Sequence, residues 1–276
     1  MAHRPSRSGA KPGATREQVE RRERFVRARR DALRGASGAV AALYGWHTVT
    51  AALRNPARHV RKLLATENAA RRLAEEGITA KPDIVRSAAI ADRLAPDAVH
   101  QGLYLEADPL PAPAIEEVPA KGMVLVLDQI TDPHNVGAIL RSAAAFAATA
   151  IVTTQRHSPE ATGALAKAAS GALELVPLVN VQNLARGLDA LKARGFLVAG
   201  LDSSGDSDLS ALALRTPLAL VLGAEGKGLR QLTKATCDYV ARIDLPGGIK
   251  SLNVSNAATL SLYIARRAVQ NETADR

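Results

Sequence analysis

From residue 122 onward, short apolar runs alternate with stretches whose apolar residues recur at helical spacing, and this alternation restricts the fold more than any other feature. The strand-like runs are Met123–Leu127, Ala150–Thr154, Phe196–Ala199, Leu218–Leu222 and Tyr239–Ile243. The helical stretches span about 134–147, 160–171, 181–194, 228–236 and 254–269. Strands that alternate with helices pair in parallel, because a helix carries the chain back to the start of the next strand. The pattern therefore predicts an α/β domain with a mostly parallel sheet covered by helices.

Periodicity alone would favour a Rossmann-like domain, but the segment after the first strand does not fit one. A dinucleotide-binding domain carries a glycine-rich fingerprint at that place. This chain has Asp128–Asn135 there instead. General rules of chain connection disfavour knots, so the pattern by itself predicts none.

Composition divides the chain into four parts. Residues 1–38 contain Pro, Gly and Ser and then an Arg-rich block, and residues 39–106 have the mixed pattern of a small α/β domain. Residues 107–120 contain four prolines, which stiffen a segment and block helix formation, and we interpret them as a linker between domains. Residues 121–276 form the parallel-sheet domain.

The basic charge of the chain is concentrated at its N-terminus. The formal net charge is +9, and residues 1–34 contribute +7 of it. Such a segment is typical of proteins that bind polyanions. Phe25 is its only aromatic residue, so a contact with RNA would be made to phosphates and with little sequence selectivity. The alternative is a solvated, disordered tail.

Cysteine, histidine and apolar content exclude several classes of protein. Cys237 is the only cysteine, which rules out an internal disulfide, and the six histidines have no metal-ligand spacing. No apolar run approaches the length of about 18 residues that a membrane helix requires. We expect a soluble, cytoplasmic protein without a metal site.

Three polar segments stand where strands end and helices begin. In the first, Asp132 as N-cap and Pro133 at the first helical position predict a helix start. The helix is expected to bury Val136, Ile139, Leu140, Ala143 and Ala147. It carries Asn135 and Arg141, which lie about 9 Å apart along its axis. The alternative for Arg141 is a surface arginine or one paired with Glu225.

The second and third segments are rich in glycine. Gly223, Gly226 and Gly228 allow the backbone to approach a ligand closely, or simply to turn from strand to helix, with Glu225 at the tip. Gly247 and Gly248 permit a bend before Ser251 and Asn253, which stand at the start of the last helix. There Ser251, Asn253 or Ser255 is expected to cap the helix, and the others are free for a functional role.

Together the three segments, in this order and at this spacing, resemble the signature motifs of the SpoU (TrmH-like) RNA 2'-O-ribose methyltransferases of the SPOUT class. The resemblance implies S-adenosylmethionine as methyl donor, a deep trefoil knot in the C-terminal domain and a homodimer formed through the knotted region. It implies that the catalytic residues are Arg141, Asn135, Glu225, Ser251 and Asn253. It also implies a cofactor site at Leu222, Gly223, Gly226, Ile243, Leu245, Gly247 and Leu252. The family usually has Ile-Pro-Met where this chain has Ile243-Asp244-Leu245, so the backbone path at Asp244 is in question.

The segment Tyr44–Leu53 resembles the start of the N-terminal substrate-binding domain found in a subset of these enzymes, a small α/β domain similar to ribosomal proteins that bind RNA. Within it, His47 is either an RNA contact or, more simply, a helix-start or packing residue. The nearby basic cluster, consisting of Arg54, Arg58, Arg61 and Lys62, is either an RNA-binding surface or a solvated face.

The family resemblance implies transfer of a methyl group to a ribose 2'-hydroxyl of RNA. Because arginine has a pKa above about 12, we expect Arg141 to stabilise the developing alkoxide and clamp a phosphate rather than act as the base. A guanosine in 23S rRNA is the expected substrate, with a tRNA ribose second. The alternative from another class is a non-catalytic RNA-binding factor of ribosome assembly.

Overall fold

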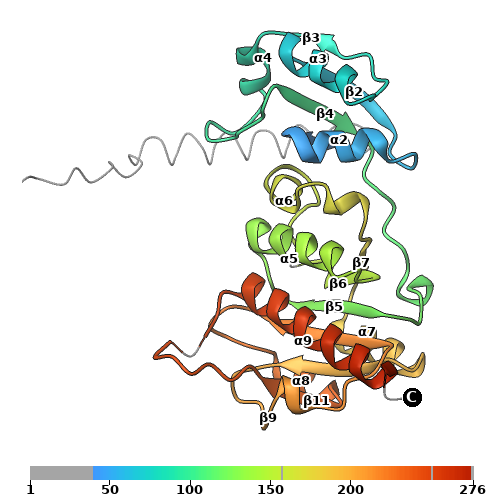
Figure 1. The fold of residues 1–276 in the computed structure, drawn as a ribbon, viewed down its shortest axis with the longest axis vertical. Helices are drawn as coiled ribbons and strands as arrows, with labels where there is room; N and C mark the ends of the chain where they lie inside the picture. Colours follow the sequence, from blue (N-terminus) through green and yellow to red (C-terminus); the bar gives the residue numbers. More distant parts are fainter. Residues whose placement is uncertain (1–39, 157, 250, 275–276) are drawn as a thin grey trace, which may run out of the picture.

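The computed structural model describes residues 40–156, 158–249 and 251–274, and they form two α/β units joined by an extended segment (Figure 1). The segment expected as a basic tail, residues 1–38, lies outside the described residues. The smaller unit contains helices α2 (Trp46–Arg54), α3 (Glu67–Glu75) and α4 (Ser87–Ala91). Its sheet has the strand order β1 (Ala41–Tyr44), β4 (Leu103–Ala107), β2 (Val60–Ala65) and β3 (Asp83–Ile84).

The larger unit is built on a seven-stranded sheet in which every pair of neighbouring strands is parallel. The strand order is β7 (Leu178–Val181), β6 (Ala150–Thr154), β5 (Met123–Asp128), β10 (Leu218–Gly223), β8 (Leu197–Leu201), β11 (Tyr239–Arg242) and β9 (Ser207–Asp208). The predicted parallel α/β architecture is confirmed, while the trefoil knot stays a prediction.

Apolar residues on both faces of the central strands explain why helices cover both sides of this sheet. Along β5, Leu125 and Leu127 face one core, whereas Val124 and Val126 face the other, because successive side chains of a strand point to opposite faces. The first core is completed by α5 (Pro133–Ala145), α6 (Gly163–Ala169) and α9 (Val254–Ala274). The second is completed by α7 (Leu184–Ala193). The short α8 (Gln231–Thr236) precedes β11.

Helix α5 begins as the sequence predicts and ends earlier. The Asp132 carboxylate accepts a hydrogen bond from the His134 backbone N–H at 3.1 Å, and Pro133 is the first helical residue. The prediction that Ala147 is buried on this helix is wrong. The helix ends at Ala145, and Ala147 is exposed in the left-handed region with φ of 53°. After this left-handed residue the chain is buried again at Ala148 and continues into β6.

The segment expected as a proline-rich linker contains a short helical turn that its prolines do not prevent. This 3₁₀ turn, η1, spans Ile115–Glu117. Ile115 and Val118 are buried in the second core, and Arg194 donates hydrogen bonds to the carbonyl oxygens of both residues. Two further 3₁₀ turns are η2 (Ala172–Glu174) and η3 (Leu209–Ala211). None of the helices in the described ranges is both long and apolar enough to cross a bilayer.

Helices α5 and α6 pack closely because α5 has a glycine at the contact. A Cβ atom at Gly137 would lie 2.6 Å from the Leu165 carbonyl oxygen and 2.9 Å from the Ala169 nitrogen, both of them backbone atoms of α6. We therefore expect Gly137→Ala to lower the free energy of unfolding by about 1–3 kcal/mol in urea titrations. Gly187→Ala in α7 is the matched control, since the nearest neighbours of its Cβ would be side-chain atoms of Val181, at 3.3 Å or more, and not backbone. A helical alanine there should be neutral or stabilising, and equal losses for the two variants would contradict this account.

Candidate functional site

A cavity of about 550 Å³ opens at the carboxyl ends of β8, β10 and β11. Ligands bind at this edge of open parallel sheets, because loops of different strands converge there. Its wall is formed by residues from the ends of three strands, from the glycine-rich loop after β10 and from the segment before α9. They are Leu201, Asp202, Ser203, Leu222 to Gly228, Ala241, Arg242, Ile243, Leu245, Ser251 to Val254 and Ala257.

The three polar segments meet at the side chain of Asn253. Its Nδ2 donates to Asn135 Oδ1 at 3.0 Å and to Glu225 Oε1 at 3.2 Å. Its Oδ1 accepts hydrogen bonds from the Ser255 backbone N–H at 3.0 Å and from the Ser255 hydroxyl at 2.6 Å, which caps the start of α9. One amide therefore caps a helix with its oxygen and joins the other two segments with its nitrogen.

A second cavity, of about 360 Å³, adjoins the first. Both are lined by Ala224, Glu225, Lys227 and Val254, so these residues form the boundary between them. The other side of the second cavity is the segment before α5, which includes Gln129 and Asn135. Gln129 has φ of 61°, an uncommon conformation for a residue other than glycine. Two adjoining cavities can place two reactants next to each other.

The glycine-rich loop folds back on β10, and two of its glycines are required by that close approach. A Cβ at Gly223 would lie 2.2 Å from the carbonyl carbon of Gly228, because Ala224 and Gly228 form a backbone bridge. Gly228 has φ of 64°, and a Cβ there would lie 2.6 Å from Asp202 Oδ2. At Gly226, with φ of 74°, a Cβ would meet nothing within 4 Å. This loop is therefore tightly folded at its base and open at its tip.

Two carboxylates hold the far end of this loop. Asp202, at the end of β8, accepts from the Leu229 backbone N–H at 3.2 Å and pairs with Lys234 at 3.1 Å. Burial alone would raise its pKa, but hydrogen bonds from the Ser204 hydroxyl and backbone, from Lys234 and from Leu229 outweigh this effect and lower the pKa to about 2. Asp128, fully buried at the end of β5, accepts from Arg230 Nε at 2.7 Å and from the Arg230 backbone N–H at 3.1 Å.

The structure places most of the expected site residues around these two cavities. Glu225, Ser251 and Asn253 line the larger cavity, and Asn135 lines the smaller one beside Glu225. Six of the seven positions expected for the cofactor also line the larger cavity, namely Leu222, Gly223, Gly226, Ile243, Leu245 and Leu252. Gly247 lines neither cavity.

Arg141 lies on α5 beyond Asn135, is exposed and lines neither cavity. The alternative pairing of Arg141 with Glu225 is not observed. Glu225 instead accepts a hydrogen bond from the Asn253 side chain. Asp244, where the family usually has proline, is tied by its backbone N–H to Asp208 at 2.7 Å and by its carboxylate to Arg242 at 2.7 Å. Its neighbours Ile243 and Leu245 both line the larger cavity.

Sequence reasoning missed Asp128, Asp202 and Lys227. Asp128 is the last residue of β5 and Asp202 directly follows β8, so the rule that ligands bind at the carboxyl edge of a parallel sheet would have singled out both. Lys227 lies between glycines of a motif that was interpreted through its glycines and Glu225 alone. Among the residues that the structure describes, no cluster of three or more His, Cys, Asp or Glu side chains could hold a metal ion.

Comparison with known protein families assigns both units of the chain. Residues 122–263 match the SpoU rRNA methylase family, and residues 42–113 match the family described as RNA 2'-O ribose methyltransferase substrate binding. Among curated proteins, the 23S rRNA (guanosine-2'-O-)-methyltransferase RlmB of Pseudomonas putida is 35% identical over 239 residues, covering 83% of this chain and 96% of that protein. RlmB of Ralstonia nicotianae is 37% identical over 82% of this chain and 94% of its own length.

Solved structures share the fold over nearly the whole chain. The SpoU methyltransferase AviRb from Streptomyces viridochromogenes has a TM-score of 0.73 at 23% identity and covers 94% of this chain and 99% of its own. An rRNA methyltransferase from Sinorhizobium meliloti, crystallised with S-adenosylmethionine bound, has a TM-score of 0.72 at 21% identity, covering 91% and 94%.

Because Asp202 is charged when it holds the loop, its contribution to stability depends on pH. We expect Asp202→Asn to lower the free energy of unfolding at pH 7 by about 2 kcal/mol. A carboxylate with a lowered pKa stabilises the fold above its unfolded value of 3.8 and loses this effect as the pH falls toward about 2. The difference in free energy of unfolding between wild type and Asp202→Asn, measured in urea titrations, should therefore become smaller below about pH 3.8. The same substitution at exposed Asp206 is the control, and a gap independent of pH would contradict the assignment.

Proposed function

Because the chain belongs to the SpoU rRNA methylase family, and is therefore an RNA 2'-O-methyltransferase, we propose that it methylates a guanosine ribose of 23S rRNA with S-adenosylmethionine as donor. The observation that supports this most directly is the meeting of Asn135, Glu225 and Asn253 at the boundary of two adjoining cavities. One cavity is suited to a donor and the other to an acceptor.

The larger cavity fits a nucleoside-sized donor. Its volume of about 550 Å³ is in the range of small-molecule sites, and apolar side chains such as Leu222, Ile243 and Leu252 alternate there with backbone of the glycine-rich loop. We assign donor binding to the seven positions that the family resemblance implies. Six of them line the larger cavity, and Gly247 lies outside its lining. S-adenosylmethionine supplies a methyl group on a positively charged sulfur, which is already a good leaving group.

The smaller cavity is our proposed site for the target ribose. Asn135 borders it, and the Asn253 amide holds both Asn135 and Glu225 in place, so the polar groups are already oriented before RNA arrives. As the ribose oxygen bonds to the methyl carbon, the methyl–sulfur bond breaks, S-adenosylhomocysteine leaves, and the hydroxyl proton passes to a phosphate oxygen of the RNA or to water. Partial negative charge develops on the ribose oxygen during this step. The Asn135 side-chain NH2, whose partner oxygen is held by Asn253, is a donor that can stabilise this charge. Ser251, at the rim of the donor cavity, completes the proposed set.

Arg141 is proposed to act on the RNA rather than on the donor. It is exposed on α5, and its side chain makes no hydrogen bond or ion pair with another residue in the described part of the chain. Its guanidinium is thus available to bind a phosphate next to the target ribose and to stabilise the developing alkoxide. The family's usual proposal, in which this arginine is the base, requires loss of a proton from a guanidinium, which stays protonated in proteins.

The nature of the substrate is supported by the relatives. RlmB proteins that cover most of this chain are named for guanosine 2'-O-methylation of 23S rRNA, and a tRNA ribose is the second candidate. A non-catalytic assembly factor would have no need for the Asn135–Asn253–Glu225 arrangement. The proposal includes a homodimer formed through the knotted region and action in the cytoplasm, as the family resemblance implies.

The experiment that tests this function is transfer of tritium from methyl-labelled S-adenosylmethionine to 23S rRNA transcripts, followed by mapping of the modified ribose. We expect one labelled guanosine in 23S rRNA and none in tRNA. Label in tRNA alone would show that a tRNA ribose is the substrate instead of 23S rRNA. No label in either RNA would overturn the proposal that the protein is an enzyme.

Asn253→Asp separates helix capping from the bridge between segments. Aspartate caps a helix as well as asparagine does, but it cannot donate to Asn135 and Glu225, and its charge lies next to Glu225. We expect a Tm near that of the wild type and a loss of about 10²-fold or more in kcat. Ser255→Ala, which removes only an arm of the cap, should keep most of the activity. Equal activities of the two variants would show that the bridge has no catalytic role.

Arg141→Lys keeps the positive charge but removes the forked pair of donors. If Arg141 clamps a phosphate and the developing alkoxide, kcat should fall by about 10²-fold while the affinity for S-adenosylmethionine, measured by calorimetry, stays unchanged. Turnover close to that of the wild type would rule out the forked clamp.

A further inference from the structure

The substrate-binding unit is packed against the methyltransferase unit through a continuous apolar cluster. Leu43, Trp46 and Val49 of the small unit belong to the same buried cluster as Leu165 of α6 and Leu173 of η2. In Figure 1, α2 lies next to α6, on the side of the larger unit that also carries α5. The two units therefore share a core at this contact in addition to the connecting segment.

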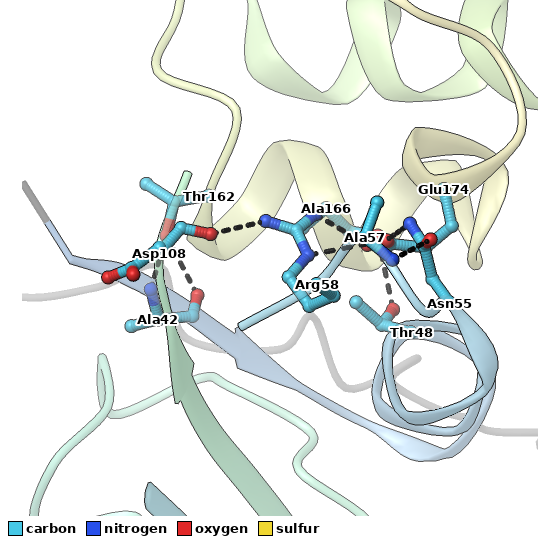
Figure 2. A network of polar contacts seen from close by, with 9 residues as sticks. All are labelled: Ala42, Thr48, Asn55, Ala57, Arg58, Asp108, Thr162, Ala166 and Glu174. Atoms are coloured by element: carbon cyan, nitrogen blue, oxygen red, sulfur yellow. Dashed lines mark hydrogen bonds and ion pairs between the residues drawn. The ribbon is translucent and has the colours of Figure 1, made fainter. Parts of the chain in front are cut away.

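A buried ion pair crosses the same contact (Figure 2). Arg58, which follows α2, donates from Nη2 to Glu174 Oε1 at 2.6 Å and from Nε to Oε2 at 3.3 Å. The side chains of Arg58 and Glu174 are only 2% and 4% exposed. Asn55 donates to Glu174 Oε2 at 2.6 Å, and Arg58 Nη1 donates to the Asp108 carbonyl oxygen at 2.8 Å. A two-pronged arginine–carboxylate pair fixes the relative orientation of its partners as well as their distance.

At the opposite end of the contact, a threonine hydroxyl of the larger unit binds the edge strand of the small unit. Strand β1 lies at the edge of its sheet, and the backbone groups of Ala42 form hydrogen bonds with the larger unit. The Thr162 hydroxyl accepts from the Ala42 N–H and donates to the Ala42 carbonyl oxygen, each at 2.8 Å. Between the two ends, the Thr48 hydroxyl donates to the Ala166 carbonyl oxygen at 3.1 Å. Figure 2 shows these contacts along one side of the interface.

The elements that receive these contacts are packed against α5, the helix that carries Asn135 and Arg141. Thr162 and Ala166 belong to the start and middle of α6, and Glu174 ends η2, which directly follows it. Helix α6 packs on α5 with backbone contact at Gly137, two residues after Asn135. The small unit is therefore attached close to Asn135 and Arg141, rather than at a distant edge of the sheet.

We propose that Arg58 and Glu174 are positioning residues that lock the substrate-binding unit in one orientation relative to α5, so that RNA held by the small unit presents its target ribose at the Asn135 side of the site. This role rests on the proposed function for its RNA, but the lock itself is a property of the protein alone. It has two measurable consequences: a single interdomain distance and a low KM for RNAs that reach both units.

The first test measures the distance between spin labels at Thr79→Cys in the small unit and Asp189→Cys on α7, both exposed positions. The native Cys237 is poorly reactive because burial raises its thiol pKa to about 11, and wild-type protein treated with the same label is the control for it. We expect one narrow distance distribution, which Glu174→Gln broadens. Glu76→Gln is the matched control, since it makes the same change of charge at a glutamate paired with Arg54 inside the small unit. It should leave the distribution narrow.

The second test compares kinetics on a long 23S rRNA fragment and on the shortest hairpin that is still methylated. We expect Glu174→Gln to raise KM for the long fragment at least about tenfold, because a loosely held unit contributes a lower effective concentration. Its kcat and its KM for the hairpin should match those of Glu76→Gln within about twofold. An unchanged KM and a narrow distribution in Glu174→Gln would overturn the lock.

If circular dichroism shows that Glu174→Gln is poorly folded, a milder pair of variants tests the same lock between the two units. Thr162→Val removes the hydroxyl that holds Ala42, whereas Thr162→Ser keeps it. The valine variant should broaden the distance distribution and raise KM for the long fragment, and the serine variant should restore both. Equal behaviour of the two would also overturn the lock. If wild-type protein labels no RNA, the proposed function fails, and the distance measurement still decides whether the lock exists.

Discussion

The candidate site depends on the placement of one side-chain amide. Asn253 lies at the start of the last helix, and its oxygen is committed to the cap while its nitrogen reaches both other segments. A carboxylate or a hydroxyl could cap the helix, but neither could donate to two acceptors at once. The two cavities keep their shared boundary because this amide fixes Glu225 against Asn135. Residues more than a hundred positions apart in the chain thereby act as one group.

Much of this arrangement could be predicted from the sequence, and the rest could not, for identifiable reasons. The apolar runs predicted the main parallel strands, and Asp132-Pro133 predicted the start of α5, because local hydrogen bonding and burial decide both. Strands β7 and β9 were missed, since β7 is only partly buried and β9 has two residues. Ala147 was misplaced because a left-handed residue ends the helix, which helical spacing does not reveal.

The residues of the candidate site also divide into those that the sequence predicts and those that it does not. The resemblance of the three motifs to a known family implied seven cofactor positions, and six of them line the larger cavity. Partners of charged residues depend on tertiary structure instead. No pattern in the sequence indicated that Asp202 would hold the loop at Leu229, or that Arg58 in a basic cluster would be buried against Glu174. The basic cluster predicts that arginine on an RNA-binding surface or a solvated face, and its burial shows that both predictions are wrong for it.

The order of the pocket along the chain has a consequence for biosynthesis. Every residue that lines the larger cavity lies between Leu201 and Ala257, whereas the small unit and strands β5, β6 and β7 precede it. During translation the small unit therefore emerges from the ribosome before any residue of the proposed donor site. Strand β10 must then enter the sheet between β5 and β8, both already synthesised, before any donor can bind. If the larger cavity is the donor site, as proposed, the growing polypeptide cannot form it until Ala257 has emerged, so donor binding requires β10 and the start of α9 to be in place.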